Sequence, residues 1–263
     1  MNLFTLLFTE ILYRPVFNLL IVFLAIFGGN LGIAIILLTV VVRLLMVKQS
    51  WMGNDMQKGM ADLQPKLTEI QEKYKDDPKK LSAETMKVFK THGGWPLKGC
   101  LMLLIQIPVF IWLFTVVRKI TNNEVPTEWL YSFFNGFGTQ FLEPKNINHM
   151  FLGMDMLATK NIVLTIISAV FTYLQMKLTT LAKPATPAIP GANVPDMGKM
   201  MWFMNIFMVF MIGSFVYGTQ AAIGLYIATT SIFSVVQYAI QYRALLKAKW
   251  LEWRSKGQNI IVK

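Results

Sequence analysis

The chain has 263 residues, of which 54% are hydrophobic and 15% charged, and its formal net charge is +11. Its mean hydropathy of +0.48, with several apolar runs close to the ~20 residues that span a bilayer, indicates an integral membrane protein. In a chain of 263 residues, membrane helices can account for most of the sequence. They leave no room for a large soluble enzyme domain except in residues 48–95. The composition therefore excludes a soluble globular enzyme and predicts one helical bundle.

The first apolar stretch, residues 3–27, differs from a plain membrane span because polar residues and a proline interrupt it. The interruptions are Glu10, Arg14, Pro15 and Asn18, and Gly28 and Gly29 follow the stretch. Although it is apolar enough for a sixth span, we interpret it as a helix that lies in the membrane interface. We expect no cleavable signal, since no basic region precedes the apolar start and no small-residue cleavage site stands out.

Residues 31–47 form the next apolar run, LGIAIILLTVVVRLLMV, with Arg43 well inside it. An arginine at the centre of a membrane helix costs roughly 2.5–3.5 kcal/mol on insertion scales. Its side chain is therefore expected to face a partner or a water-filled cavity within the protein. This makes Arg43 the first candidate for a functional residue.

The stretch that follows, residues 49–95, has the pattern of a cytoplasmic helical hairpin. Apolar residues recur at three- and four-residue intervals over residues 52–70, KDDP at residues 75–78 breaks the pattern, and residues 81–89 resume it. One interpretation is a self-paired hairpin with solvated charged faces. The other is a hairpin that docks to another protein or to lipid headgroups, and the two are compatible.

Apolar runs later in the chain complete five candidate spans, and helices are the expected spanning form because lipid offers no partner for backbone polar groups. The predicted fold is all-α, a polytopic membrane bundle of five transmembrane helices with a cytoplasmic hairpin and an amino-terminal interfacial helix. Its expected segments are an amphipathic interfacial helix (1–29), a first transmembrane helix (30–48), a cytoplasmic helical hairpin (49–95), a second transmembrane helix (96–118), an extracellular loop (119–160), a third transmembrane helix (161–182), a cytoplasmic linker (183–199), the fourth and fifth transmembrane helices (200–241) and a basic cytoplasmic tail (242–263).

Lysine and arginine placement predicts the orientation of this bundle. Ten lysines within residues 48–98, and six lysines and arginines after residue 242, place both segments in the cytoplasm. Residues 118–160 carry four positive and four negative side chains, which suits an outside loop. We therefore expect an outside amino terminus and a cytoplasmic carboxyl terminus. Most of the net positive charge is thus explained by the orientation of the chain in the membrane, although a basic tail also suits contact with ribosomal RNA.

The fourth candidate span is rich in methionine, with six residues between Met197 and Met211 that lie mostly on one face. They are interpreted either as flexible packing between helices or as an adaptable surface for varied substrate segments.

Residue patterns for catalysis are not found in the sequence. Cys100 is the single cysteine, and His92 and His149 fall on opposite sides of the membrane in the predicted topology, which excludes a metal site shared by the two histidines. The chain contains no glycine-rich phosphate loop and no serine or cysteine triad pattern. We expect that the protein is no enzyme and binds no cofactor or metal.

Three ordered runs carry a resemblance to a known family: GNLGIAIILLTVVVRLL, LQPKLTEIQEKYKDDPKKL and HGGWPLKGCLMLLIQIPVFIWLF. They resemble the YidC-type membrane protein insertases, whose relatives work in mitochondria and chloroplasts. The match covers about residues 10–117 and continues more loosely in FLGMDM, YLQMKL and GLYIATTSIFSVVQYAIQYR.

The resemblance implies a hydrophilic groove that is open to the cytoplasm and to the lipid but closed toward the outside, with Arg43 as its fixed positive charge. A wet cavity with one arginine would stabilise the acidic flank of a substrate, while the apolar segment of the substrate enters lipid without hydrolysis. Thr39 lies one turn before Arg43 on the same face, and Tyr226 matches an aromatic residue of the last family span. The amides of Gln106 and Gln175 lie at membrane depth, where they face the groove or bond a neighbouring helix.

The sequence departs from the family pattern at three positions. Ile227 stands where an aromatic residue is common, Lys48 lies near the place of a proline, and Trp95 replaces an asparagine. The large outside domain of many Gram-negative insertases has no counterpart, so the chain resembles the bacterial short form.

The resemblance therefore implies a membrane protein insertase and chaperone of the bacterial plasma membrane that is functional as a monomer. Its expected partners are nascent membrane proteins and membrane lipids, with the Sec translocon, the signal recognition particle receptor and the ribosome as candidates. The alternative is a small membrane transporter or channel, although the internal repeats and intramembrane acids typical of that class are missing. An assembly factor that holds membrane proteins without inserting them is a further, closer alternative.

Overall fold

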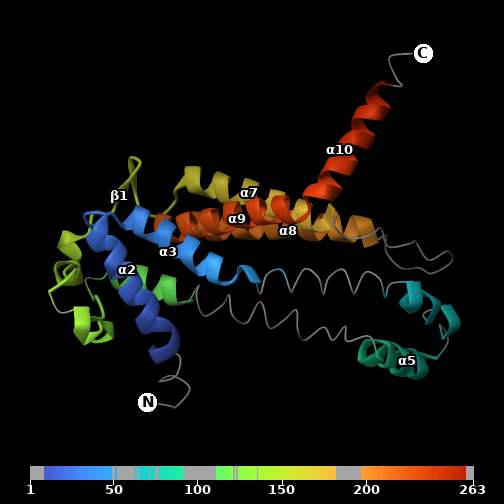
Figure 1. The fold of residues 1–263 in the computed structure, drawn as a ribbon, viewed down its shortest axis with the longest axis horizontal. Coiled ribbons are helices and arrows are strands. Elements are labelled where there is room, and N and C mark those ends of the chain that lie inside the picture. The colour runs from blue at the N-terminus through green and yellow to red at the C-terminus, as the bar shows by residue number, and fades with distance from the viewer. Residues whose placement is uncertain are drawn as a thin grey trace.

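The computed structural model describes residues 9–48, 51, 63, 65–70, 72–74, 77–91, 111–120, 122, 124–134, 136–181 and 197–258. Most of them are helical (Figure 1), and the all-α fold class is confirmed. The helices are η1 (Thr9–Tyr13, a π-helical turn), α2 (Arg14–Ile26), α3 (Leu31–Leu45), α5 (Pro78–Thr91), α7 (Ile162–Leu181), α8 (Met197–Gly218), α9 (Ala221–Gln241) and α10 (Arg243–Gln258), with residues 65–70 and 111–120 also helical.

The segment between residue 120 and α7 consists of short elements. Its described residues form four 3₁₀ turns and a small antiparallel hairpin, in which Met150 pairs with Asp155 and Phe151 with Met154. The elements are η2 (Thr127–Trp129), η3 (Ser132–Phe134), η4 (Thr139–Leu142), η5 (Pro144–Asn146), β1 (Met150–Phe151) and β2 (Met154–Asp155).

A glycine pair ends α2 and lets the chain reverse into α3. Gly28 and Gly29 have φ angles of +61° and +82°, a left-handed conformation that side chains disfavour. The Gly29 amide donates to the Leu24 carbonyl at 2.7 Å, and the side chain of Asn30 then caps α3 by accepting from the Ile33 amide at 3.0 Å. The reversal brings α2 against α3.

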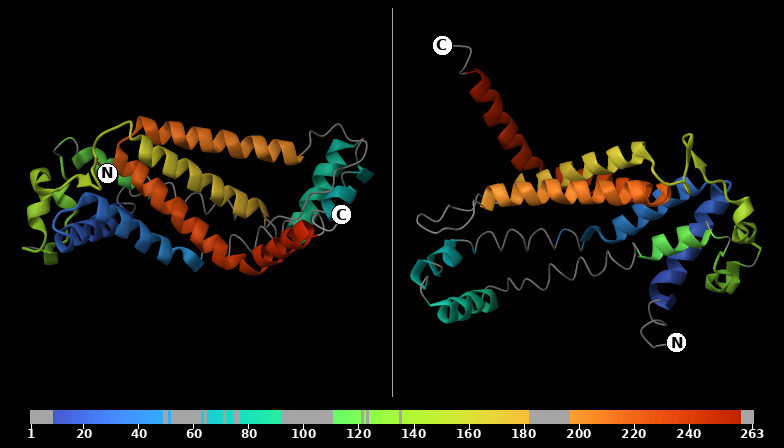
Figure 2. Two further views of the ribbon diagram at one scale, coloured as in Figure 1. Left: turned by 90° about the horizontal axis from the view of Figure 1, so that it is seen from above. Right: turned by 180° about the vertical axis from the view of Figure 1, so that it is seen from behind.

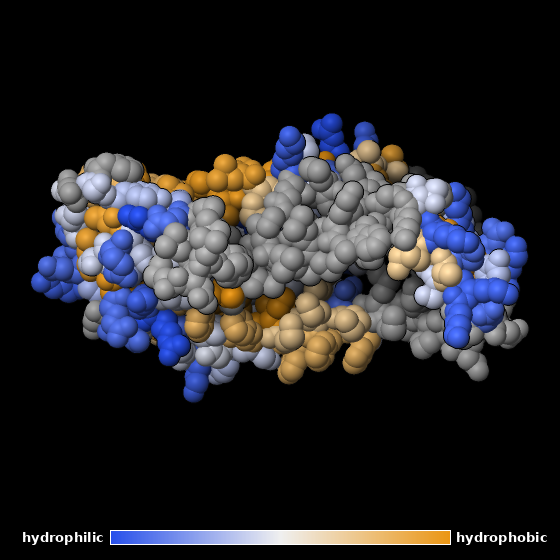
Figure 3. Space-filling view, turned by 90° about the horizontal axis from the view of Figure 1, so that it is seen from below, coloured by the Kyte–Doolittle hydropathy of each residue, from blue (hydrophilic) through white to orange (hydrophobic). Residues whose placement is uncertain are grey.

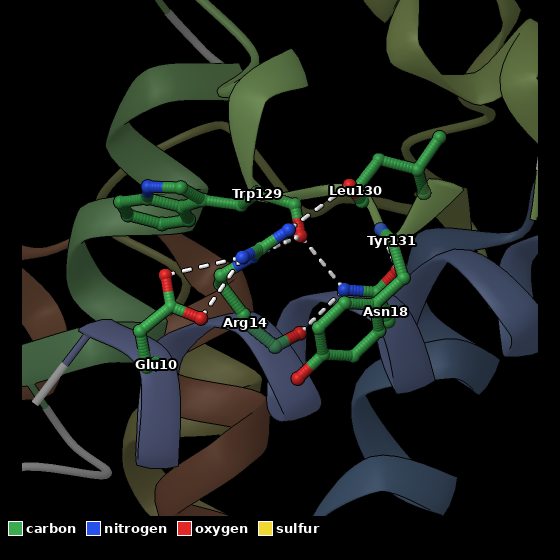
Figure 4. A network of polar contacts seen from close by, with 6 residues as sticks. All are labelled: Glu10, Arg14, Asn18, Trp129, Leu130 and Tyr131. Atoms are coloured by element: carbon green, nitrogen blue, oxygen red, sulfur yellow. Dashed lines mark hydrogen bonds and ion pairs between the residues drawn. The ribbon is translucent and has the colours of Figure 1, made fainter. Parts of the chain in front are cut away.

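The polar residues of α2 form a network with the segment around η2 (Figure 4). A guanidinium nitrogen of Arg14 contacts the Glu10 carboxylate at 2.9 Å, and its guanidinium lies 4.8 Å from the centre of the Tyr131 ring. Asn18, which is 3% exposed, donates to the Trp129 carbonyl at 2.8 Å and accepts from the Tyr131 amide at 2.9 Å. These polar residues therefore connect α2 to a distant segment. The interfacial position of residues 1–29 stays a prediction.

The long helices lie side by side in the order α8, α7, α9, α3 (Figure 2). α9 is the central helix, since it packs against α7 on one side and α3 on the other. The approach at the start of α9 is close, because a Cβ atom at Gly224 would lie 2.8 Å from Val216 of α8 and 3.3 Å from Leu164 of α7.

The largest buried cluster lies where α2, the start of α3 and residues 111–120 meet the short elements. Its fully buried side chains include Phe17, Leu20, Ile21, Leu24, Leu31, Ile35, Trp112, Val116, Val117 and Met156. This cluster supports the end of the bundle from which α3 and α9 extend.

Helix α8 exposes apolar side chains around most of its circumference. Within residues 202–218 only Gly213 and Val216 are buried, whereas Trp202 and Phe203 are each 62% exposed and Phe210 is 71% exposed. A helix that is apolar on all sides and largely unpacked is typical of a membrane environment. The methionines Met204 and Met211 share this exposure, which leaves both interpretations of them open.

Within the described ranges, two helical stretches are long and apolar enough to cross a membrane, Ile162–Thr180 and Ala221–Gln241. Three shorter helices are also apolar: Arg14–Ile26, Leu31–Leu45 and Trp202–Gly218. The second predicted span, residues 96–118, is described only from residue 111 onward. The number of five spans therefore stays a prediction.

The surface also separates by polarity along the molecule. On the face shown in Figure 3, hydrophobic residues lie above and below the middle of the molecule, and hydrophilic residues gather at its two ends, with a further group at the upper edge. This distribution fits an apolar band between two aqueous faces.

The glycine pair provides a test of the turn between α2 and α3. Gly28→Ala meets no atom within 4 Å, so we expect only the left-handed strain of about 1–2 kcal/mol. Gly29→Ala adds a clash at 2.7 Å with the Phe141 ring and 2.8 Å with the Asn146 carbonyl, and we expect roughly 1–3 kcal/mol more. Thermal unfolding in detergent should rank wild type above Gly28→Ala above Gly29→Ala. Equal stabilities of the two variants would contradict this account of the turn.

The carboxylate of Asp155 predicts an acid-sensitive contribution to stability. Burial disfavours its ionised form, but hydrogen bonds from the Leu157 amide (2.9 Å) and the His149 ring (2.8 Å) outweigh this effect and hold the pKa of Asp155 below its usual value. A lowered folded-state pKa stabilises the fold above the unfolded pKa of about 4, and the contribution is lost as pH falls through the folded value. As the pH is lowered from about 5, the melting temperature of Asp155→Asn should therefore fall less than that of the wild type. Parallel curves would rule this contribution out.

Candidate functional site

Arg43 lies in the last turn of α3, beside the central helix α9. Its side chain is half-buried, whereas the next two residues, Leu44 and Leu45, are 58% and 79% exposed. The groups that interact electrostatically with its guanidinium are the hydroxyls of Tyr226 and Tyr238 on α9. These tyrosines are twelve residues apart, or roughly 18 Å along a helix, so Arg43 lies alongside the part of α9 between them.

No carboxylate neutralises Arg43 within the part of the chain that the structure describes. The salt bridges found there all join other residues, and none includes Arg43. Phenol groups can accept hydrogen bonds but remain neutral at physiological pH. The guanidinium of Arg43 therefore keeps its charge available within an otherwise apolar run.

The face of α9 between the two tyrosines carries polar groups that the sequence interpretation missed. Thr230 lies four residues after Tyr226, and Gln237 lies seven residues after Thr230. At 100° per residue, the three side chains share one face of the helix. Tyr226 and Gln237 are 6% and 8% exposed. The Thr230 hydroxyl oxygen and the Gln237 amide nitrogen are buried without a hydrogen-bond partner among the described residues.

Unpaired buried polar atoms are costly. Each costs about 1–3 kcal/mol unless water or another molecule satisfies it. Among the described residues, two of the three such atoms share this face of α9, beside the helix that carries Arg43, and the third is the Trp112 ring nitrogen in the buried cluster. The signal in the sequence was the spacing of Thr230 and Gln237 from Tyr226 within an apolar run.

The opposite side of α9 satisfies its polar groups. The Ser168 hydroxyl of α7 donates to the Gly224 carbonyl at 3.2 Å, and the hydroxyls of Thr172 and Ser231 lie 3.1 Å apart. Small residues and hydroxyl pairs of this kind are typical of close helix packing in membranes. α9 therefore has a paired polar face toward α7 and a second face, called the unpaired face below, on which Thr230 and Gln237 each leave a polar atom without a partner among the described residues. Tyr226 lies on the same face and does interact with other groups.

The other sequence candidates have different positions. Thr39 is 3% exposed, and its hydroxyl donates to the Ile35 carbonyl at 2.6 Å, so its proton is used within α3. Gln175 is half-buried on α7, one turn beyond Thr172, and α7 lies across α9 from α3. Gln106 lies outside the described residues. The structure thus brings Arg43 and Tyr226 together and leaves Gln175 on a helix across α9.

The remaining sequence candidates concern metals and thiols. His92 and Cys100 lie outside the described residues, and His149 pairs with Asp155. Within the described ranges no group of three histidine, cysteine, aspartate or glutamate side chains is arranged to hold a metal ion.

The apolar helices and the buried polar face define a helical membrane protein. The model of a family described as the 60Kd inner membrane protein matches residues 22–248. The chain belongs to this family, and the resemblance to YidC-type insertases is confirmed.

Relatives of two kinds match the chain. Membrane protein insertase YidC of Oceanobacillus iheyensis is 32% identical over 85% of this chain and 79% of its own length, and YidC 2 of Bacillus anthracis is 30% identical over 87% and 78%. YidC of Helicobacter pylori is 43% identical over 104 residues, which are 40% of this chain and only 19% of that protein. The chain therefore spans most of the shorter relatives and a small part of the longer one.

Proposed function

We propose that this protein is a membrane protein insertase and chaperone that passes hydrophobic segments of nascent membrane proteins into the bilayer through a hydrophilic groove. The groove would lie between α3 and the unpaired face of α9 and would open to the cytoplasm and to lipid. The observation that carries the proposal is the half-buried Arg43, which no carboxylate among the described residues neutralises, beside a helix on which Thr230 and Gln237 each leave a buried polar atom unpaired within the same described ranges. Its membership of the insertase family supports the same conclusion.

Water in the groove would account for the unpaired atoms of Thr230 and Gln237. It would hydrogen-bond to both and hydrate the guanidinium, which removes most of the cost of burying them. Lipid alone would leave those groups unsatisfied at several kcal/mol each. A hydrated groove is therefore the arrangement in which these residues are stable.

The groove would act on a substrate through charge and hydration. The acidic flank of an entering segment would bind near Arg43, where a water-filled site lowers the cost of carrying a carboxylate partway across. The apolar part of the segment would then leave sideways into lipid, where burial of about 20 apolar residues is favourable without hydrolysis. The exposed apolar surface of α8 is suited to contact such segments.

The proposed topology has five spans in the bacterial plasma membrane, with the amino terminus outside and the basic carboxyl terminus in the cytoplasm. The basic segments 48–98 and 242–263, which are both expected in the cytoplasm, support this topology. The proposed partners are nascent membrane proteins and lipids, with the Sec translocon, the signal recognition particle receptor and the ribosome as cooperating machinery, and the protein would act as a monomer. Among the groove residues we propose Arg43 and Tyr226 as central, with Thr39 and Gln106 as further lining. Gln175 is not proposed for this groove, because it lies on α7, across α9 from α3.

The charge of Arg43 can be tested on reconstituted protein in liposomes. Arg43→Ala should reduce insertion of single-span substrates with acidic outside flanks at least about tenfold, because a charge-assisted hydrogen bond contributes roughly 1.5–3 kcal/mol. Substrates with neutral flanks should be affected less, and Arg43→Lys should retain much of the activity. Arg118→Ala, which removes an exposed arginine from residues 111–120, is the matched control.

Two outcomes of this experiment would contradict the proposal. Equal activity of Arg43→Ala on every substrate would refute the role of the charge. Solute or ion flux through the liposomes without insertion would instead favour a small transporter or channel.

The hydration of the groove can be tested by cysteine labelling. In a Cys100→Ser background, Gln237→Cys should react with a water-soluble maleimide at least about tenfold faster than Ser231→Cys, because the reactive thiolate forms only where water reaches the thiol. Ser231 is the matched control, since it lies on the same helix but in the paired interface with α7. Equally slow labelling at both positions would exclude a hydrated groove along this face.

A further inference from the structure

We propose that α10 is a membrane-surface helix that binds anionic phospholipid headgroups on the face where α9 leaves the bilayer. The inference rests on the proposed function in one respect, the assignment of α9 as a membrane span with a cytoplasmic end. It adds a lipid-binding surface that is separate from the groove.

The position of α10 follows from the end of α9. α9 ends at Gln241 and α10 begins at Arg243, with only Tyr242 between them, so its first turn lies at the level where the apolar span stops. The rings of Tyr238 and Tyr242 stack at this corner with their centres 6.2 Å apart. Tyrosines are enriched at the level of the headgroups.

The direction of α10 is that of a helix leaving the bundle. Figures 1 and 2 show it turned steeply away from the axis of α9. If α9 crosses the bilayer, a helix turned this way runs over the membrane surface and not further into the cytoplasm. A helix of 16 residues is about 24 Å long, so its whole length can stay near the headgroups.

The side chains of α10 combine exposed apolar groups with a surplus of positive charge. Trp250 is 53% exposed and Leu251 is 49% exposed. The helix contains five lysines and arginines and a single glutamate. Exposed apolar side chains on a strongly basic helix are typical of peripheral membrane binding.

The arrangement of these residues suits the interface between water and lipid. Leu246 and Trp250 are one turn apart and share a face, with Arg243, Lys247 and Arg254 on one flank and Lys249 on the other, and the sequence continues the pattern with Trp253 and Lys256. The Arg254 guanidinium lies 5.4 Å from the centre of the Trp250 ring. The Trp250 ring would enter the headgroup layer while Arg243, Lys247 and Arg254 beside it reach phosphates.

The observations favour lipid over RNA as the binding partner. Basic side chains alone serve either partner, since both present phosphates. The exposed Trp250 ring gains nothing from a phosphate backbone but gains from burial in the acyl boundary. The membrane surface is also the partner that α9 brings into reach.

The test uses the full-length protein in vesicles of phosphatidylcholine with or without phosphatidylglycerol and with nitroxide lipids as quenchers. In a Cys100→Ser background, a fluorescent label is attached to Trp250→Cys, to Ala248→Cys or to Val236→Cys. Positions 248 and 250 lie nearly opposite one another on α10, and Val236 is a 54% exposed position of α9. We expect strong quenching at 236 in both vesicles, and at 250 but not 248 in vesicles that contain phosphatidylglycerol.

Charge reversal supplies the second arm. Each positive charge near an anionic surface strengthens binding about fivefold, so Lys247→Glu with Arg254→Glu should reduce quenching at 250 to the level at 248. The same charge change at Lys79 and Lys80 of α5, both exposed, is the control and should leave quenching at 250 unchanged.

Each contrary outcome overturns the inference in a recognisable way. Quenching at 236 without quenching at 250 would leave the membrane span in place and refute the lipid surface of α10. A label at 250 that responds to ribosomal RNA and never to anionic vesicles would assign the helix to RNA instead. Loss of quenching at 236 would remove the span itself, and with it both this inference and the topology of the proposed function.

Discussion

Lipid offers no hydrogen bonds, so every polar group on a helix within the bilayer needs a partner from protein or water. The central helix α9 meets this constraint in two ways. Toward α7 its polar groups pair with hydroxyls, as Ser231 does with Thr172. Toward the region between Tyr226 and Gln237, two buried polar atoms have no partner in the described part of the chain. The proposed hydrated groove follows from this difference between the two faces.

The rest of the fold holds these faces in position. The Gly28–Gly29 reversal and the Asn30 cap determine where α3 begins, and α3 carries Arg43, thirteen residues after its cap, alongside α9. Arg14 and Asn18 join α2 to the segment at Trp129, which closes the packed end of the bundle. The buried cluster at this end also includes Ala221, Ala222 and Tyr226 of α9, so α3 and α9 carry both the packed end and the polar face.

Some site residues were within reach of the sequence and others were not. Arg43 was found because one charge in an apolar run is costly wherever the helix packs. Thr230 and Gln237 carried a weaker signal, since uncharged polar residues in a membrane helix serve ordinary packing as often as function. Thr39 shows the reverse case, in which a suitable spacing from Arg43 did not reveal that its hydroxyl bonds within its own helix. For Gln175, spacing could not tell that α9 separates α7 from α3.

The sequence by itself determined that the chain is a membrane protein and that its apolar runs form helices, because hydropathy and hydrophobic periodicity are local properties of the chain. It also carried the family, through ordered motifs whose match extends over residues 22–248. Only the tertiary structure decided which polar residues face one another, that α9 lies at the centre, and that α10 turns away from it. These depend on contacts between segments far apart in the chain, and such contacts leave no periodic trace in a single sequence.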